Sequence, residues 1–115
     1  MKGLGSDIIE VERIEESIQK HGPRFLDRLF TPQEQAYCLK FRDASRHFAG
    51  RFAAKEAIVK ALGTGFGEEF GWLDIEIIND PQGKPLAMIT NIPSGKIELT
   101  ISHCKAYAMA VAVWI

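Results

Sequence analysis

The stretch Phe48 to Gly65 reads FAGRFAAKEAIVKALGTG and predicts the central helix of the fold. Its middle consists of strong helix formers, and Gly63 follows them as the residue best suited to the left-handed turn after a helix. At about 100° per residue, its large apolar side chains fall on one stripe that should face a core. These side chains are Phe48, Phe52, Val59 and Leu62.

A second face of this helix carries Glu56 and Lys60, which are four residues apart and therefore neighbours. Ala49 and Ala53 share that face, so no bulky side chain stands beside the two charges. A carboxylate and an ammonium group one turn before the loop Gly63-Thr64-Gly65 suggest a place for a phosphate and a metal ion. The same spacing also fits an ordinary solvated ion pair on a helix with a glycine cap.

Two further motifs accompany the central stretch: GLGSDIIEVERI at residues 3–14 and ISHCKAYA at residues 101–108. With them, the chain closely resembles the holo-[acyl-carrier-protein] synthases, the small single-domain members of the 4'-phosphopantetheinyl transferase superfamily. The three motifs occur in the order of that family and span nearly the whole chain. Val59 departs from the pattern, because relatives carry a small or hydroxyl-bearing residue there.

Length and composition describe an ordinary globular domain. The chain has 115 residues, 46% of them hydrophobic and 25% charged, so residues 1–115 are expected to form one domain. The net charge of −1 gives no general attraction to nucleic acid or to an anionic membrane, and no apolar run reaches the length of about 18 residues that spans a bilayer. Two isolated cysteines and the lack of a signal-peptide pattern favour the cytoplasm.

The order of the expected elements predicts an α+β fold: an N-terminal strand, three to four helices and about four antiparallel strands. Thr31 as N-cap, Pro32 and Glu34 form a clear helix start. The expected elements are a strand at residues 2–9, helices at 10–20, 24–30 and 31–41, a connection at 42–46, the central helix, and strands at 72–78, 86–90, 97–102 and 107–115.

The resemblance implies that Asp7 and Glu56 are the ligands of a Mg²⁺ ion that holds the pyrophosphate of coenzyme A. Mg²⁺ prefers hard oxygen ligands and is usually held by one or two carboxylates together with substrate phosphate. From the residues alone, Asp7 equally fits a cap of the helix that follows it. Lys60 would balance charge on the phosphate as its bond breaks, or is simply a solvated surface lysine.

The resemblance also implies a set of residues around coenzyme A. Arg51 and His103 are expected to contact its phosphates or nucleotide, and Pro85 its adenine. Gly63, Thr64 and Gly65 are expected to present backbone N–H groups and one hydroxyl to phosphate oxygens. Without the resemblance, a single histidine at this place in a strand is more often a packed core residue.

Arg13, Arg24 and Arg28 make the first helical region locally basic in a chain of net charge −1. The functional interpretation is a docking surface for the acidic helix of acyl carrier protein, because a guanidinium group donates to carboxylates in a fork. Nearby glutamates dilute the patch, and an ordinary solvated face is the alternative.

The expected activity is transfer of the 4'-phosphopantetheine group of coenzyme A to a serine of apo-acyl carrier protein, in support of fatty acid biosynthesis. Glu56, or a water molecule on the metal ion, would take the serine proton. A non-catalytic nucleotide-binding module and a plain trimeric scaffold are the rival interpretations, and the intact set Asp7, Glu56 and Lys60 argues against both.

The resemblance further implies a homotrimer with active sites shared between chains. The last strand, AMAVAVWI, adds a reason to expect association, because it is apolar at nearly every position. A sheet covered by helices on one face needs apolar residues only at alternate positions, so the second face of this strand should also be buried.

Overall fold

The computed structural model describes all residues from Met1 to Ile115. Its elements are β1 (Gly3–Glu10), α1 (Val11–His21), α2 (Pro23–Leu29), α3 (Pro32–Cys38), α4 (Ala44–Leu62), a 3₁₀ helix η1 (Trp72–Asp74), β2 (Ile75–Asn79), β3 (Pro85–Ile89), β4 (Ile97–His103) and β5 (Tyr107–Trp114). The predicted α+β class, with one strand, four helices and four further strands, is confirmed. None of the helices is both long enough and apolar enough to cross a membrane.

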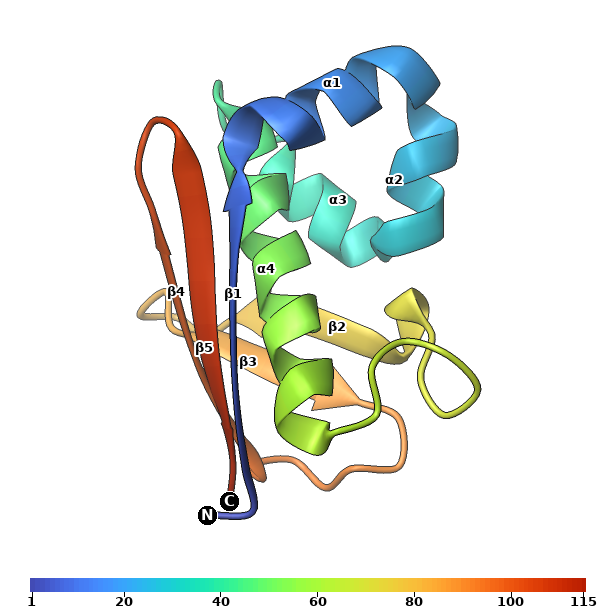
Figure 1. Ribbon diagram of the computed structural model, residues 1–115. Helices are drawn as coiled ribbons and strands as arrows, with labels where there is room; N and C mark the ends of the chain where they lie inside the picture. Colours follow the sequence, from blue (N-terminus) through green and yellow to red (C-terminus); the bar gives the residue numbers. More distant parts are fainter.

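The strands form two antiparallel sheets rather than one. The larger sheet has the order β1-β5-β4, and β2 and β3 form a separate two-stranded sheet. Because β1 pairs along one edge of β5, the first and last strands of the chain lie side by side, with both termini at one end of the molecule (Figure 1).

Helix α4 runs along the inner face of the larger sheet, with α1, α2 and α3 gathered around its N-terminal half (Figure 1). The contact between β1 and α4 depends on two glycines. A Cβ atom on Gly3 would lie 1.8 Å from the Ala61 carbonyl oxygen, and one on Gly5 would lie 2.0 Å from that of Ala57. The two backbones therefore touch, and Asp7, two residues after Gly5, is brought against the side of α4.

Strand β5 alternates small buried residues with larger ones that face outward. Ala108, Ala110 and Ala112 are fully or almost fully buried beneath α4. On the opposite face of the sheet, Met109 is 42% exposed and Ile8, its neighbour on β1, is 65% exposed. The expectation that β5 is buried on both faces is therefore wrong for the single chain, because no element of the chain covers the outer face.

Several predicted boundaries move by a few residues. The capping box is confirmed, since the Glu34 backbone N–H donates to Thr31 Oγ1 at 3.2 Å and Glu34 Oε1 accepts from the Thr31 N–H at 2.9 Å. Helix α4 begins at Ala44, inside the segment expected to be a connection. The Asp43 carboxylate pairs with Arg46 at 3.0 Å and favours a helix N-terminus there.

The predicted strand at residues 72–78 starts late, because its first three residues form η1 and the strand begins at Ile75. Asp74 accounts for the difference. Its Oδ2 atom accepts a hydrogen bond from the Gly71 N–H at 2.8 Å, which closes the turn before the strand can start.

Candidate active site

Asp7 on β1 and Lys60 on α4 form an ion pair across the contact between the two elements. Lys60 Nζ lies 3.2 Å from Asp7 Oδ1 and donates to the Ser6 carbonyl oxygen at 2.9 Å. The structure excludes the Glu56–Lys60 pair on one helix and the helix cap by Asp7. Lys60 is paired with Asp7 rather than with Glu56, and Asp7 caps no helix, because the N-cap position of α1 is Glu10.

Glu56 lies close enough to this pair for its ionisation to respond to it. Burial raises the pKa of Glu56 above its usual value, the negative charge of Asp7 raises it further, and Lys60 opposes both. The three side chains are therefore one electrostatic cluster of two carboxylates and an ammonium group. A cation between the carboxylates would remove the repulsion that raises this pKa.

The donor set fits Mg²⁺. The two carboxylates supply hard oxygen atoms, and no group of three or more His, Cys, Asp and Glu side chains surrounds them. Mg²⁺ commonly takes only one or two carboxylates and leaves its other positions to water and phosphate. Sites for zinc, which is usually held by three or four protein side chains, have a different composition.

The backbone N–H groups of the loop after α4 have other partners than the sequence suggested. Gly63 adopts the left-handed conformation (φ 79°) and ends the helix as predicted. Its N–H donates to the Lys60 carbonyl oxygen, and the N–H groups of Thr64 and Gly65 both donate to that of Val59. These N–H groups are therefore occupied in closing α4, which contradicts the expectation that they are free for phosphate. The Thr64 hydroxyl is also engaged, because it donates to the Gly65 carbonyl oxygen at 2.9 Å.

A hollow with a volume of about 150 Å³ is lined by Arg51, Pro85 and His103. Arg51 is 4% exposed and has no carboxylate partner. Its Nη2 donates to Asn79 Oδ1 at 2.5 Å, its guanidinium group lies 4.1 Å from the centre of the Tyr37 ring, and its Nε atom has no partner. A buried cation without an anion is costly, so this hollow favours an anionic ligand.

His103 is exposed at the end of β4, which excludes the packed core histidine considered from the sequence. Its ring meets that of His47 edge to face, with centroids 5.2 Å apart. Burial and the nearby His103 lower the pKa of His47, despite the Asp43 carboxylate beside it.

Sequence reasoning missed three polar side chains of the hollow that Arg51 shares. They are Tyr37, His47 and Asn79. Tyr37 lies in the helix predicted at residues 31–41, His47 directly follows the predicted connection, and Asn79 directly follows the strand predicted at residues 72–78. Only the spacing of His47 and Arg51, four residues apart on α4, could have indicated a shared face.

The carboxylate cluster and the hollow around Arg51 lie on opposite sides of α4 within one chain. Asp7 is on β1 and His103 on β4, and these strands are the two edges of the larger sheet, with β5 between them. Arg51 and Glu56 are five residues apart, which places them roughly 140° apart around the helix. A single chain therefore does not bring the hollow and the carboxylates together.

The three predicted docking arginines are exposed, and none forms an ion pair. Arg24 and Arg28 line a hollow of about 310 Å³ together with His21 and Phe25. Arg13, on α1, does not line this hollow. The surface therefore offers unpaired positive charge beside an aromatic side chain.

Comparison with known proteins identifies close relatives. The sequence model of the 4'-phosphopantetheinyl transferase superfamily matches residues 3–112. The holo-[acyl-carrier-protein] synthase of Protochlamydia amoebophila (strain UWE25) is 55% identical over 97% of this chain and 96% of its own length.

Two solved structures have the same fold. The holo-(acyl-carrier-protein) synthase from Bacillus anthracis str. Ames, in complex with CoA (3',5'-ADP), is 42% identical, with a TM-score of 0.84 over 98% of this chain and 95% of that one. The Helicobacter pylori enzyme, in complex with coenzyme A, is 37% identical, with a TM-score of 0.87 over 97% of this chain and 99% of that one.

Proposed function

Because the chain belongs to the 4'-phosphopantetheinyl transferase superfamily, we propose that it transfers 4'-phosphopantetheine from coenzyme A to a serine of apo-acyl carrier protein. The products are holo-acyl carrier protein, which serves fatty acid biosynthesis, and adenosine 3',5'-bisphosphate. The observation that carries this proposal is the cluster of Asp7, Glu56 and Lys60, in which two elements far apart in sequence bring two carboxylates and an ammonium group together.

Asp7 and Glu56 would hold Mg²⁺, which when bound withdraws charge from the pyrophosphate oxygens of coenzyme A. The remaining chemistry belongs to side chains of this chain. Glu56, half-buried beside Lys60, would accept the serine proton as general base. Lys60, half exposed and joined only to Asp7 and the Ser6 carbonyl, can turn to the departing phosphate and stabilise its charge.

The nucleotide of coenzyme A would occupy the hollow of Arg51, Pro85 and His103. The unpaired guanidinium group supplies the positive charge that a phosphate needs, and Pro85 offers an apolar surface for a base. The loop Gly63 to Gly65 would lie along the pyrophosphate of coenzyme A, beside Lys60.

The enzyme would work as a homotrimer, because the two halves of this site face different sides of α4. The nucleotide hollow of one copy can complete the carboxylate cluster of the next. The uncovered face of the larger sheet supports association, since Leu4, Ile8 and Met109 are exposed there. A closed ring of three copies would bury all three such faces.

Arg13, Arg24 and Arg28 would bind the acidic helix of the carrier protein. They are free of acidic partners within the chain, so binding the carrier breaks no existing ion pair.

Both cysteines, Cys38 and Cys104, are unpaired, which suits a protein that acts in the reducing cytoplasm.

Intact mass spectrometry tests the proposal. The protein is mixed with coenzyme A, Mg²⁺ and apo-acyl carrier protein, and the carrier should gain the mass of one phosphopantetheine group. A carrier whose target serine is replaced by alanine is the control. Binding of coenzyme A without any mass gain would contradict the enzyme and favour the nucleotide-binding module.

A further inference from the structure

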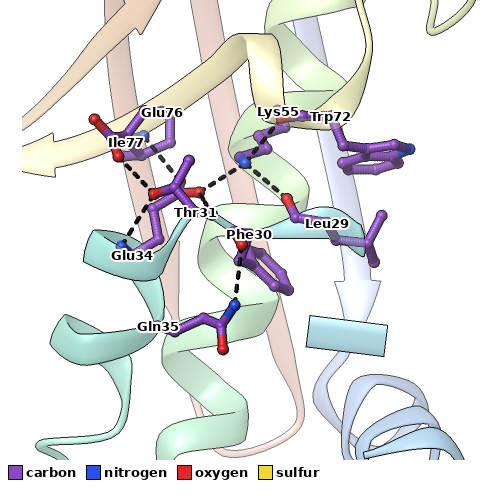
Figure 2. Close-up of polar contacts among 9 residues, drawn as sticks. All are labelled: Leu29, Phe30, Thr31, Glu34, Gln35, Lys55, Trp72, Glu76 and Ile77. Atoms are coloured by element: carbon purple, nitrogen blue, oxygen red, sulfur yellow. Dashed lines mark hydrogen bonds and ion pairs between the residues drawn. The ribbon is translucent and has the colours of Figure 1, made fainter. Parts of the chain in front are cut away.

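Glu34 on α3 and Lys55 on α4 form an ion pair in the interior that the proposed mechanism does not use. Lys55 Nζ lies 2.7 Å from Glu34 Oε1, and both side chains are completely buried. The ammonium group also donates to the Leu29 carbonyl oxygen at 2.8 Å and to that of Trp72 at 3.0 Å (Figure 2). All three of its hydrogens thus have an acceptor.

The Glu34 carboxylate is equally well satisfied. Its Oε1 atom also accepts from the Thr31 N–H, and its Oε2 atom accepts from the Ile77 N–H at 2.9 Å (Figure 2). Burial lowers the pKa of Lys55, and the charge and hydrogen bond of Glu34 oppose that shift. The pair therefore joins α4 to four other segments: the end of α2, the start of α3, η1 and β2.

Trp72 connects this pair to the loop at residues 63–71. Its ring stacks on that of Phe66, with centroids 3.9 Å apart and an interplanar angle of 14°. The Trp72 ring also stacks on the ring of Phe52 in α4, with centroids 5.0 Å apart. Phe66 directly follows Gly65, so the position of Trp72 limits where the start of the loop can lie.

The loop has few other attachments to the rest of the fold. Phe70 is buried in the core, and the Gly67 N–H donates only within the loop, to the Phe70 carbonyl oxygen. The half of the loop next to Lys60 is thus fixed by the helix end, by the stack on Trp72 and by the packing of Phe66 against the core. A pair of apolar side chains in place of Glu34 and Lys55 could fill the same space, but it could not hold the Trp72 carbonyl.

We propose that Lys55 and Glu34 are positioning residues for the coenzyme A site. Through the Trp72 carbonyl and the Trp72–Phe66 stack, they hold the loop at residues 63–71 beside Lys60. The inference rests on the proposed function, in which this loop borders the phosphates. Neither residue touches substrate, and both act through the loop.

The double variant Glu34→Gln/Lys55→Met tests this, because it removes both charges and leaves no unpaired ion in the interior. Loop order is measured without substrate, by digestion of the folded protein with a glutamate-specific protease and mass mapping of cleavage after Glu68 and Glu69. We expect cleavage there to become about tenfold faster, as expected when a bond of ordinary strength is lost. We also expect KM for coenzyme A to rise about tenfold while KM for the carrier changes less than about twofold.

Two further variants separate loop release from general destabilisation. Val11→Ala removes buried apolar volume at the start of α1, far from the loop, and should leave both cleavage and KM for coenzyme A as in the wild type. Phe66→Ala keeps the buried pair but removes the stack, and should reproduce the effects of the double variant. If the double variant fails to fold, wild-type cleavage in Phe66→Ala still overturns the proposal, because the loop would then not depend on the stack.

Wild-type cleavage in a folded double variant would overturn the proposal, whatever Phe66→Ala shows. So would a released loop with unchanged KM for coenzyme A, or equal changes in KM for both substrates. Failure of the wild type to modify any carrier would instead contradict the proposed function, and the substrate-free digestion would still report on the loop.

Discussion

Lys60 Nζ lies 3.2 Å from Asp7 Oδ1, and this pair joins α4 to β1 across 53 positions of sequence. The Lys60 side chain is half exposed and that of Asp7 is 17% exposed, so the pair is accessible to ligands. A metal ion on Asp7 would compete with Lys60 for the same carboxylate. Metal binding and release of the ammonium group toward substrate would therefore be coupled.

The first prediction concerns the metal ion. Asp7→Asn and Glu56→Gln should each reduce transfer by roughly 100-fold or more, because each removes a charged ligand from the proposed Mg²⁺ site. The folds should persist, since neither side chain belongs to the core. Thermal unfolding with and without Mg²⁺ checks the cause: the wild type should be stabilised by Mg²⁺ and the variants should not.

Glu98→Gln is the matched control for that experiment, because Glu98 is an exposed carboxylate that pairs with Lys84 at 3.2 Å. It should keep both the activity and the response to Mg²⁺. Wild-type turnover of either site variant at limiting Mg²⁺ would make the metal assignment wrong.

The second prediction concerns pH. The folded state raises the pKa of Glu56, so it binds a proton more tightly than the unfolded chain does. This contribution to stability is present below the ordinary glutamate pKa and is lost as pH rises through the raised pKa. In a metal-free buffer, Glu56→Gln should therefore be more stable than the wild type at neutral pH.

Urea unfolding at a series of pH values, with chelator present, measures this effect. The wild type should lose stability relative to Glu56→Gln as pH rises above the ordinary glutamate pKa, and the difference should then level off. Parallel stability curves for the two proteins would show that Glu56 is not perturbed in solution.

The third prediction concerns shared active sites. Asp7→Ala and His103→Ala should each impair activity alone, and mixing the two chains should restore part of it. Restoration requires that the carboxylates of one copy act with the hollow of another, so that some sites in a mixed trimer contain neither lesion. Light scattering should report three copies per particle.

Full activity of a monomer at the working concentration would contradict this arrangement. Met109→Glu supplies an independent check, because it places a charge on the uncovered face of the sheet. It should dissociate the trimer and abolish activity together, whereas Lys96→Glu, at an exposed turn, should do neither.

The fourth prediction concerns the carrier. Arg24→Ala and Arg13→Ala should raise KM for acyl carrier protein severalfold, with little change in KM for coenzyme A, because these arginines lie away from both parts of the cofactor site. Added salt should weaken carrier binding in the wild type and less so in the variants. Equal effects on both substrates would place the arginines in the cofactor site instead.

The sequence alone determined the α+β class, the capping box at Thr31 and Glu34, the end of α4 at Gly63 and the choice of Asp7, Glu56 and Lys60 as candidate site residues. These features depend on short-range patterns: the spacing of apolar residues, helix caps and sequence motifs. Tertiary contacts seldom change what such patterns specify. The same stripe that predicted the buried face of α4 also held an unused signal. Lys55 lies within it, between Phe52 and Val59, and a lysine on a buried face needs a partner.

Only the tertiary structure decided which residue that partner is. Glu34 reads as a capping residue in the sequence, yet its carboxylate also meets Lys55 and the backbone of β2. Likewise, the spacing of Glu56 and Lys60 suggested a pair on one helix, whereas the close approach that Gly5 permits gives Lys60 to Asp7 on β1. Such choices depend on which segments the sheet order brings together, and no local pattern specifies a contact between residues so far apart in the chain.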